Sequence, residues 1–202
     1  MNMRFFDFPN KIKFPALFIA IILLAYLFWR IVLVGGSFVP KEFLEANQQG
    51  ALIATQIVDF SKKSVSNIDK INDLDREENY SEALNLIMEE ISRNEEMKKE
   101  AYNLSFELAK MAETLKEIKP KVATETALRG INYETSLIIR LINYNAFMGN
   151  LLITLRDKFT GKMVEEGKVG EIIKKINDEA TAINDLNEQY KAAMNEFDEK
   201  IK

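Results

Sequence analysis

Residues 169–197 read VGEIIKKINDEATAINDLNEQYKAAMNEF, and this stretch decides the fold. A large apolar residue recurs at every seventh position, namely at Val169, Ile176, Ile183, Tyr190 and Phe197. Leu186 and other apolar residues fill the adjoining positions. This spacing makes an apolar stripe along one side of an α-helix, wide enough for packing in a bundle. The pattern predicts a long amphipathic helix over residues 168–202.

Three earlier stretches have the same helical periodicity, over residues 40–74, 79–118 and 121–160. Pro40 is well placed to open the first helix, and Asn79 begins a capping box for the second. The connections are short, so helices that follow one another should run antiparallel. The sequence therefore predicts an all-α protein: a long, coiled-coil-like, up-down-up-down bundle of four helices over residues 40–202.

The composition agrees with long helices and few turns. The chain has 202 residues, with only 8 glycines and 4 prolines, although turn-rich β folds need these residues at many positions. The weakest prediction is the middle of the second helix, where residues 93–100 are almost all polar. This stretch indicates either a solvated part of a continuous helix or a break near Asn94 into two shorter helices. The second alternative faintly resembles a tetratricopeptide hairpin, but no second copy follows.

The absence of cysteine and histidine removes several kinds of chemistry. Zinc sites built on these residues, and Ser–His or Cys–His nucleophile pairs, cannot be formed. The pairs Glu89–Glu90 and Glu95–Glu96 are interpreted as solvated faces, because adjacent residues on a helix point in different directions. We expect no enzyme activity, no cofactor and no metal site. The net charge of −4 with mixed signs also predicts no binding of nucleic acid.

Residues 14–34, from Phe14 to Val34, predict a transmembrane helix. About 20 apolar residues suffice to cross the bilayer, and this stretch of apolar residues contains one charge, Arg30. Tyr26 and Trp29 lie near its end, where aromatic rings favour the membrane interface. The Arg30 guanidinium can reach the headgroups along its flexible stem. The lipid bilayer is thus the first expected partner.

The charges around this span predict its orientation. Basic residues prevail in residues 1–13, so by the positive-inside rule this tail is cytoplasmic and the bundle lies outside, after a linker over residues 35–39. The expected location is the cell membrane, crossed once. A cleaved signal peptide is the alternative, since Gly35 and Gly36 fit the small-residue demand of the peptidase.

Polar residues within the predicted apolar rows are candidate site residues. Glu134 lies between Ala127 and Leu141 in its row, and Ser105 lies between Ala101 and Leu108. Folding the helices back on one another brings Ser105 opposite Glu134, and Gln48 or Gln49 near the same level. This predicts a buried polar layer, interpreted either as a device that fixes the register or as a pocket for a small polar or cationic ligand. The residues Asn143, Asn145 and Asn150 are expected to flank the core and face water.

The predicted layout resembles that of the bacterial LemA-type proteins, with a short cytoplasmic tail, one span and an outward-facing helical bundle. Residues 49–63, QGALIATQIVDFSKK, are similar to that family in their apolar spacing but lack its proline after the Leu-Ile pair. The layout is also similar to the four-helix sensor domains of chemoreceptors, although a receptor would need a second span. Such likeness implies architecture and does not transfer function.

These features favour a membrane-anchored interaction or scaffolding module with a protein partner, on the outer face of the membrane. A rod rich in heptads also allows a homo-oligomer. The alternative is an extracytoplasmic sensor or carrier of a small ligand, with its pocket near Glu134.

Overall fold

The part of the chain that the structure describes is helical from end to end. The structure is a computed structural model, and it describes residues 38–202. Its helices are α2 (Lys41–Arg76), α3 (Tyr80–Thr114), α4 (Lys121–Phe159) and α5 (Lys168–Lys200), with a short 3-10 helix, η1 (Leu115–Glu117), after α3. The prediction of an all-α fold with four long helices is confirmed for these residues. The predicted span from Phe14 to Val34, with the tail before it, lies outside them.

Helix α3 is continuous, which decides between the two alternatives for its polar middle. It runs without interruption through Asn94, so the alternative of a continuous helix is confirmed and the alternative of a break, with its hairpin resemblance, is wrong. The reason is that several residues in and beside this polar stretch are buried, and they recur at the spacing of an α-helix. Glu90, Asn94, Met97 and Ala101 are all buried, so one side of the helix stays in the core along its whole length.

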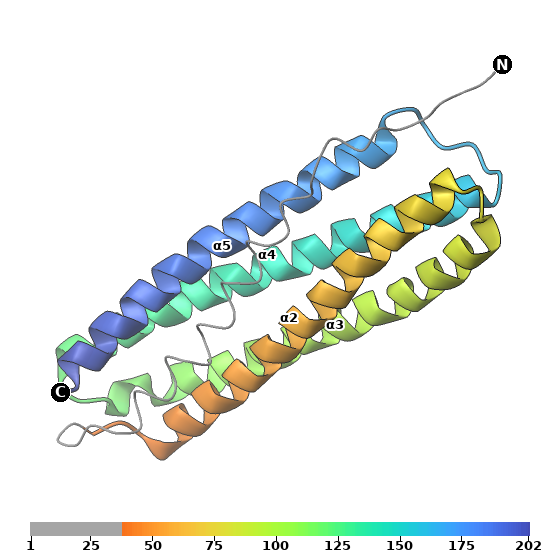
Figure 1. The fold of residues 1–202 in the computed structure, drawn as a ribbon. Coiled ribbons are helices and arrows are strands. Elements are labelled where there is room, and N and C mark those ends of the chain that lie inside the picture. The colour runs from red at the N-terminus through yellow and green to blue at the C-terminus, as the bar shows by residue number, and fades with distance from the viewer. Residues whose placement is uncertain (1–37) are drawn as a thin grey trace.

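Consecutive helices run antiparallel and pack as a bundle (Figure 1). The helices that approach closely are α2 with α3, α3 with α4, and α4 with α5. Figure 1 shows the first and last of these as long hairpins, with the C-terminus at the end of the molecule where α2 begins. The helices that pack most closely are thus neighbours in sequence, as the short connections predict.

The α2–α3 turn is closed by a Schellman motif, a pair of hydrogen bonds that caps the end of a helix. The Asn79 amide donates to the Leu74 carbonyl over 2.9 Å, and the Glu78 amide donates to the Asp75 carbonyl over 3.3 Å. This motif needs a left-handed residue, and Glu78 has a φ of 58°. The Asn79 side chain then accepts from the Glu82 amide, as the predicted capping box requires.

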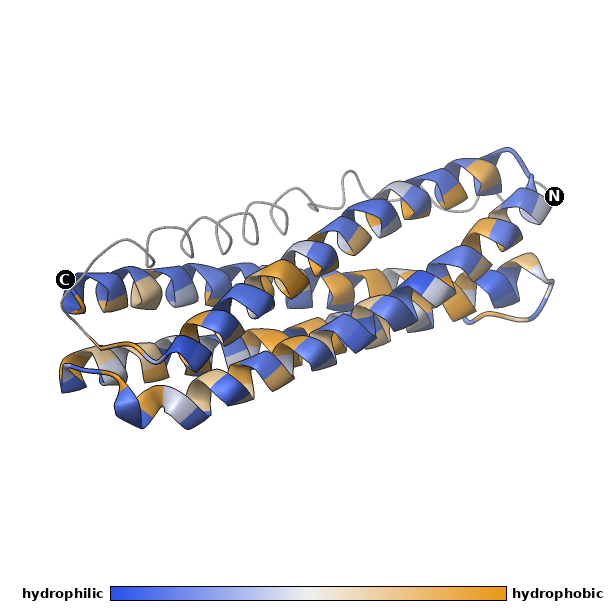
Figure 2. Cartoon of the chain, turned by 90° about the horizontal axis from the view of Figure 1, so that it is seen from below, coloured by the Kyte–Doolittle hydropathy of each residue, from blue (hydrophilic) through white to orange (hydrophobic). Residues whose placement is uncertain are grey.

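The core is one continuous apolar cluster that includes residues of all four long helices. At the end near the start of α2, the rings of Phe43 and Phe197 lie 5.9 Å apart. At the opposite end, the rings of Tyr80 and Phe159 lie 5.5 Å apart. Figure 2 shows apolar and hydrophilic residues alternating along each helix, as the heptad pattern predicts. The buried heptad residues of α5, such as Ile176 and Ile183, lie in this cluster.

Within residues 38–202, α4 alone is long and apolar enough to meet the length and composition criteria for a membrane span. In the bundle it packs against both α3 and α5.

Candidate functional site

The structure separates the four residues that were predicted to form one polar layer. Glu134 is buried, with 4% of its surface exposed. Gln48 and Gln49 are exposed, and Ser105 is half-buried, with its hydroxyl donating to the carbonyl of Tyr102 at 2.7 Å. The predicted layer is therefore wrong for three of its four members.

The error concerns which residues of α2 and α3 were predicted to face the core. On α2 the inward positions at this level are Ala46 and Gly50, which leaves both glutamines on the outside. On α3 the buried row runs through Ala101, Leu104 and Leu108, so Leu104 takes the place that was assigned to Ser105. Adjacent residues lie about 100° apart around a helix, and a shift of one residue moves a side chain off the core.

Glu134 lines a small cavity that lies among all four long helices. The cavity holds about 20 Å³, which is room for about one water molecule. Its other lining residues come from α2, α3 and α5, namely Asn47, Gly50, Ala51, Ala54, Leu104, Glu107, Leu108, Met111 and Tyr190. The small residues of α2 leave this space open, because a Cβ at Gly50 would already lie 3.4 Å from a methyl group of Leu104.

The buried carboxyl of Glu134 has an unmet hydrogen bond. Its Oε2 atom has no partner among the described residues. Burial raises the pKa of Glu134 to about 7, because water no longer stabilises the charged form. The pKa of Tyr190 is also raised, first by burial and then by the nearby charges of Glu134 and Asp198. The two side chains thus form a polar pair that is neutral when Glu134 carries its proton.

Asn187 is a second buried polar residue, and sequence reasoning missed it. None of its surface is exposed, and neither atom of its side-chain amide has a partner in the described part of the chain. It lies three residues before Tyr190 on α5, so the two share a side of the helix. The signal was present, because Asn187 is seven residues from both Ala180 and Met194. The apolar Leu186 had been assigned to that position instead, but it is only partly buried.

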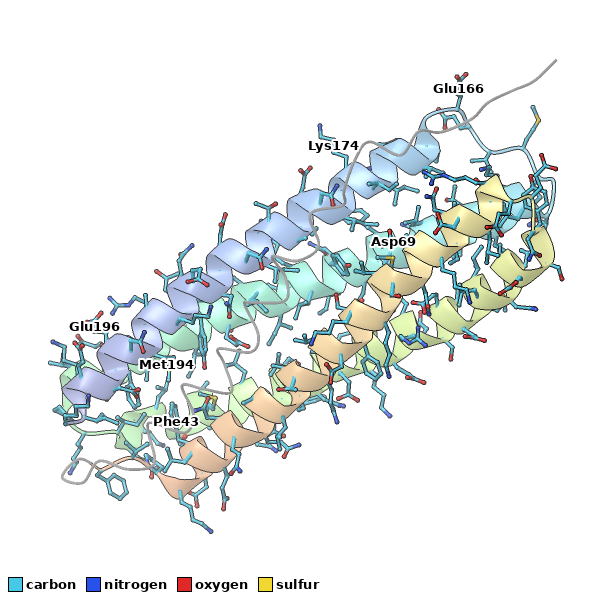
Figure 3. The ribbon with its side chains drawn as sticks, viewed as in Figure 1. Phe43, Asp69, Glu166, Lys174, Met194 and Glu196 are labelled. Atoms are coloured by element: carbon cyan, nitrogen blue, oxygen red, sulfur yellow. The ribbon has the colours of Figure 1, made fainter. Side chains whose placement is uncertain are left out.

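The end of the bundle near this cavity is closely packed around a glycine. A Cβ at Gly130 would lie 2.9 Å from the sulfur of Met194 and 3.8 Å from the ring of Tyr190. Figure 3 shows Met194 on α5 and Phe43 on α2 towards the same end of the molecule, whereas Lys174 lies towards the other. The glycine lets both α5 side chains lie directly against α4, one turn before Glu134.

Two further interpretations of polar residues are corrected by the structure. Glu90 does not face water but is buried, where it accepts hydrogen bonds from Asn67 over 2.5 Å and from Arg93. Asn145 is buried with 1% exposure rather than flanking the core. Glu89 of the first predicted pair is exposed, as expected. Burial of Glu90 is tolerated because it is matched by donors on two sides.

The outer surface of α3 and α4 carries the second candidate site. Six large apolar side chains along these two helices are between 44% and 65% exposed, namely Met88, Tyr102, Phe106, Leu128, Ile139 and Ile153, and we call these six residues the α3–α4 face. Val122, in the first turn of α4, is also 50% exposed but is not part of this face. Met88 and Phe106 are eighteen residues apart, which is five helical turns, so they project from the same side of α3. Ile139 and Ile153 are fourteen residues apart, close to four turns, and share a side of α4.

The α4 part of this face has no charged residues between Gly130 and Leu155 on the side that carries Ile139 and Ile153. Between Arg129 and Arg156, the charged residues of α4 are the buried Glu134 and Arg140, whose guanidinium reaches Glu179 of α5 over 3.4 Å. Apart from Arg140, the exposed positions between Gly130 and Ile153 other than Ile139 hold Asn132, Thr135, Ser136, Ala146 and Asn150. Charged groups normally cover the exposed side of a surface helix, so this surface is unusual. A helix surface with several exposed apolar side chains and no charged groups between them is a candidate interaction site.

The two candidate sites differ in what they can do. The cavity at Glu134 can hold a proton and a water-sized group, and an organic ligand would require the helices to separate. The α3–α4 face can bury apolar side chains against a partner. In the comparisons with known proteins, no family model, no curated protein and no solved structure matches the chain.

Proposed function

We propose that this protein is a membrane-tethered interaction module, held by residues 14–34 and presenting the α3–α4 face to a protein partner on the outer side of the membrane. The observation that carries the proposal is the side of α4 that exposes Ile139 and Ile153 and has no charged residue between Gly130 and Leu155. Burying one such side chain stabilises a complex by about 1.5–3 kcal/mol before the costs of association. The proposal assigns no catalytic reaction to the chain.

The rod shape of the bundle supports a scaffolding role. Helix α4 has 39 residues, which at about 1.5 Å per residue makes a rigid element roughly 60 Å long. The α3–α4 face extends along much of this length, from Leu128 to Ile153. A partner can therefore be held at a defined distance from the membrane, with the position set by the bundle rather than by loops.

Photo-crosslinking of the full chain in its native membrane tests this function. A photoreactive amino acid replaces Ile139 in one variant and Thr181, an exposed residue of α5, in the control. We expect a discrete protein adduct from position 139 and none from position 181. Equal labelling from both positions, or no adduct from position 139, would contradict the proposal.

A second candidate function is the sensing of a small ligand at Glu134. It is favoured by the unpartnered Oε2 atom in a cavity that reaches all four helices. Thermal unfolding of the full chain against a panel of small cations and amines tests it, with Glu134→Gln as the control variant. A rise in melting temperature that the variant loses would support the sensor. The absence of any shift in the unaltered chain would exclude it for that panel.

A further inference from the structure

We infer that the α3–α4 face binds a second copy of this chain, side by side and in parallel, with α3 of each copy against α4 of the other. This inference rests on the proposed function, because it names the partner of the same face. Its basis is a match between the exposed residues of α3 and those of α4 at equal heights along the bundle.

The heights of the two helices are fixed by one buried contact. Asn94 of α3 donates a hydrogen bond to the carbonyl of Asn145, and its amide nitrogen lies 3.1 Å from where a Cβ of Gly149 would be. Asn94 is therefore level with the middle of the segment between Asn145 and Gly149. Because the two helices are antiparallel and have the same rise per residue, each step along α3 corresponds to an equal step backwards along α4.

This correspondence places two apolar residues of each helix at the same levels, while Leu128 is level with Glu113. Met88 lies six residues before Asn94 and is level with Ile153, six residues beyond the middle of the α4 segment. Tyr102 lies eight residues beyond Asn94 and is level with Ile139, eight residues before the middle of the α4 segment. Phe106, the most exposed of the six at 65%, is level with the small uncharged Thr135.

A parallel pair turns these matches into contacts between copies. A two-fold axis along the rod preserves height and exchanges the positions of α3 and α4. Met88 of one copy then meets Ile153 of the other, and Tyr102 meets Ile139. The charged residues of α3 meet the uncharged surface of α4, so no like charges are brought together. The same two-fold axis also leaves the starts of both α2 helices at one end, as anchors in one membrane require.

The antiparallel arrangement fits less well. With the axis across the rod, α3 lies against α3 and α4 against α4. Matching Leu128 with Ile153 on α4 then sets Met88 opposite Glu113 and Phe106 opposite Glu95. It also brings Lys99 of the two copies within about one helical turn of each other. The antiparallel pair thus sets two apolar side chains opposite carboxylates, against one in the parallel pair, and adds a pair of like charges; both differences disfavour it.

Cysteine crosslinking tests the parallel pair directly, because the chain has no cysteine of its own. Two differently tagged full-length copies are produced in one membrane, one with Tyr102→Cys and the other with Ile139→Cys. On mild oxidation we expect a disulfide-linked product of twice the 23.2 kDa chain mass, at least tenfold above the control pair of Tyr102→Cys with Thr181→Cys. A product from Lys99→Cys alone, without one from the first pair, would overturn the parallel arrangement.

The adduct formed from position 139 in the photo-crosslinking experiment separates this inference from the proposed function. An adduct with twice the chain mass supports both. An adduct with a different protein, and none with the chain itself, supports the function and overturns the inference. No adduct of either kind contradicts both.

A pair of matched variants shows whether the face itself drives the association. Ile139 and Leu52 are equally exposed, at 54% and 55%, but Leu52 lies on α2, away from the α3–α4 face. Ile139→Asp should lower the fraction of dimer at least tenfold in size-exclusion chromatography with light scattering, whereas Leu52→Asp should leave it unchanged. Both variants should keep the melting temperature of the unaltered chain in its monomeric form. Dimers that survive Ile139→Asp would count against the inference.

Discussion

Asn94 of α3 donates a hydrogen bond from its side-chain nitrogen to the main-chain oxygen of Asn145 on α4, over 3.0 Å and in the core of the bundle. Both residues are at least 95% buried. This contact joins the two hairpins, α2–α3 and α4–α5, at a level where apolar packing alone would permit sliding. A polar group in an apolar seam fixes register, because any shift leaves it without a partner.

Replacing Asn94 should therefore destabilise the bundle. Asn94→Ala removes the donor and leaves a small void, and we expect a loss of about 1–2 kcal/mol in the free energy of unfolding. The measurement is unfolding of the full chain followed by far-UV circular dichroism. Asn150→Ala, at an exposed position of the same partner helix, is the control and should change stability by less than about 0.5 kcal/mol. Equal effects of the two substitutions would contradict a role for the buried contact.

The ionisation of Glu134 should make stability depend on pH. The pKa of this carboxyl is raised from 4.5 to about 7 in the folded chain, so the unfolded chain loses the proton first as pH rises. The contribution of Glu134 to the free energy of unfolding is greatest below about pH 4.5, where the carboxyl is protonated in both states. It falls between pH 4.5 and about 7 and does not change further above that range. The total loss is on the order of 3 kcal/mol.

Glu134→Gln removes this dependence, because an amide stays neutral. We expect the variant to gain stability relative to the unaltered chain as pH rises from 4.5 to 8. The difference between the two chains, measured at each pH, cancels the effects of other groups. A difference that stays constant over this range would show that Glu134 does not titrate as described.

Glu78 holds a backbone conformation that suits glycine better. Its φ of 58° lies in the left-handed region, which costs a residue with a Cβ roughly 1–2 kcal/mol. Glu78→Gly should raise the free energy of unfolding by about 0.5–1 kcal/mol. This gain is smaller than the relieved backbone cost, because glycine also increases the entropy of the unfolded chain. Glu77→Gly is the matched control, because Glu77 has a φ of −83° and should lose stability on the same substitution.

Two glycines on different helices should respond oppositely to alanine. At Gly170 a Cβ would meet nothing within 4 Å, so Gly170→Ala should stabilise α5 by about 0.5–1 kcal/mol. At Gly130 the same Cβ would lie 2.9 Å from the sulfur of Met194, so the gain should be lost or reversed. Thermal unfolding of both variants measures the contrast. A larger gain at Gly130 than at Gly170 would contradict the close packing of Met194 on α4.

The periodicity of apolar residues predicts where the four helices lie, but it does not predict which residues of each helix face the core. Apolar spacing and the breaks at Pro40 and Pro120 located the four helices, because these signals are local. Ser105 and Leu104 are adjacent, however, and only packing against α2 and α4 selects which of them turns inward. The resulting shift of one residue moved the predicted polar layer onto the surface.

The same limit explains the buried polar residues that were missed. Asn187 was passed over for the apolar Leu186, although the heptad spacing favoured Asn187. Glu90 was predicted to be exposed to solvent, because its partner Asn67 is on a different helix and no local sequence pattern indicates the contact. Glu134 was found correctly because it interrupts a long apolar row on its own helix. Buried polar positions can be read from sequence only where such a row is unambiguous.

The packing of each helix on its neighbour in sequence has a consequence for how the molecule is made. Most of the close packing between helices can form as soon as the next 40 or so residues have been synthesised, because each helix packs mainly on its neighbour in sequence. The contacts of α2 with α4 and α5, such as Asp75 with Lys158 and Phe43 with Phe197, form later. Topologies dominated by such local contacts fold in roughly microseconds to milliseconds. The α2–α3 hairpin can therefore fold while α4 and α5 are still being synthesised on the ribosome. Folding then proceeds from the N-terminal to the C-terminal helices, in the order of synthesis.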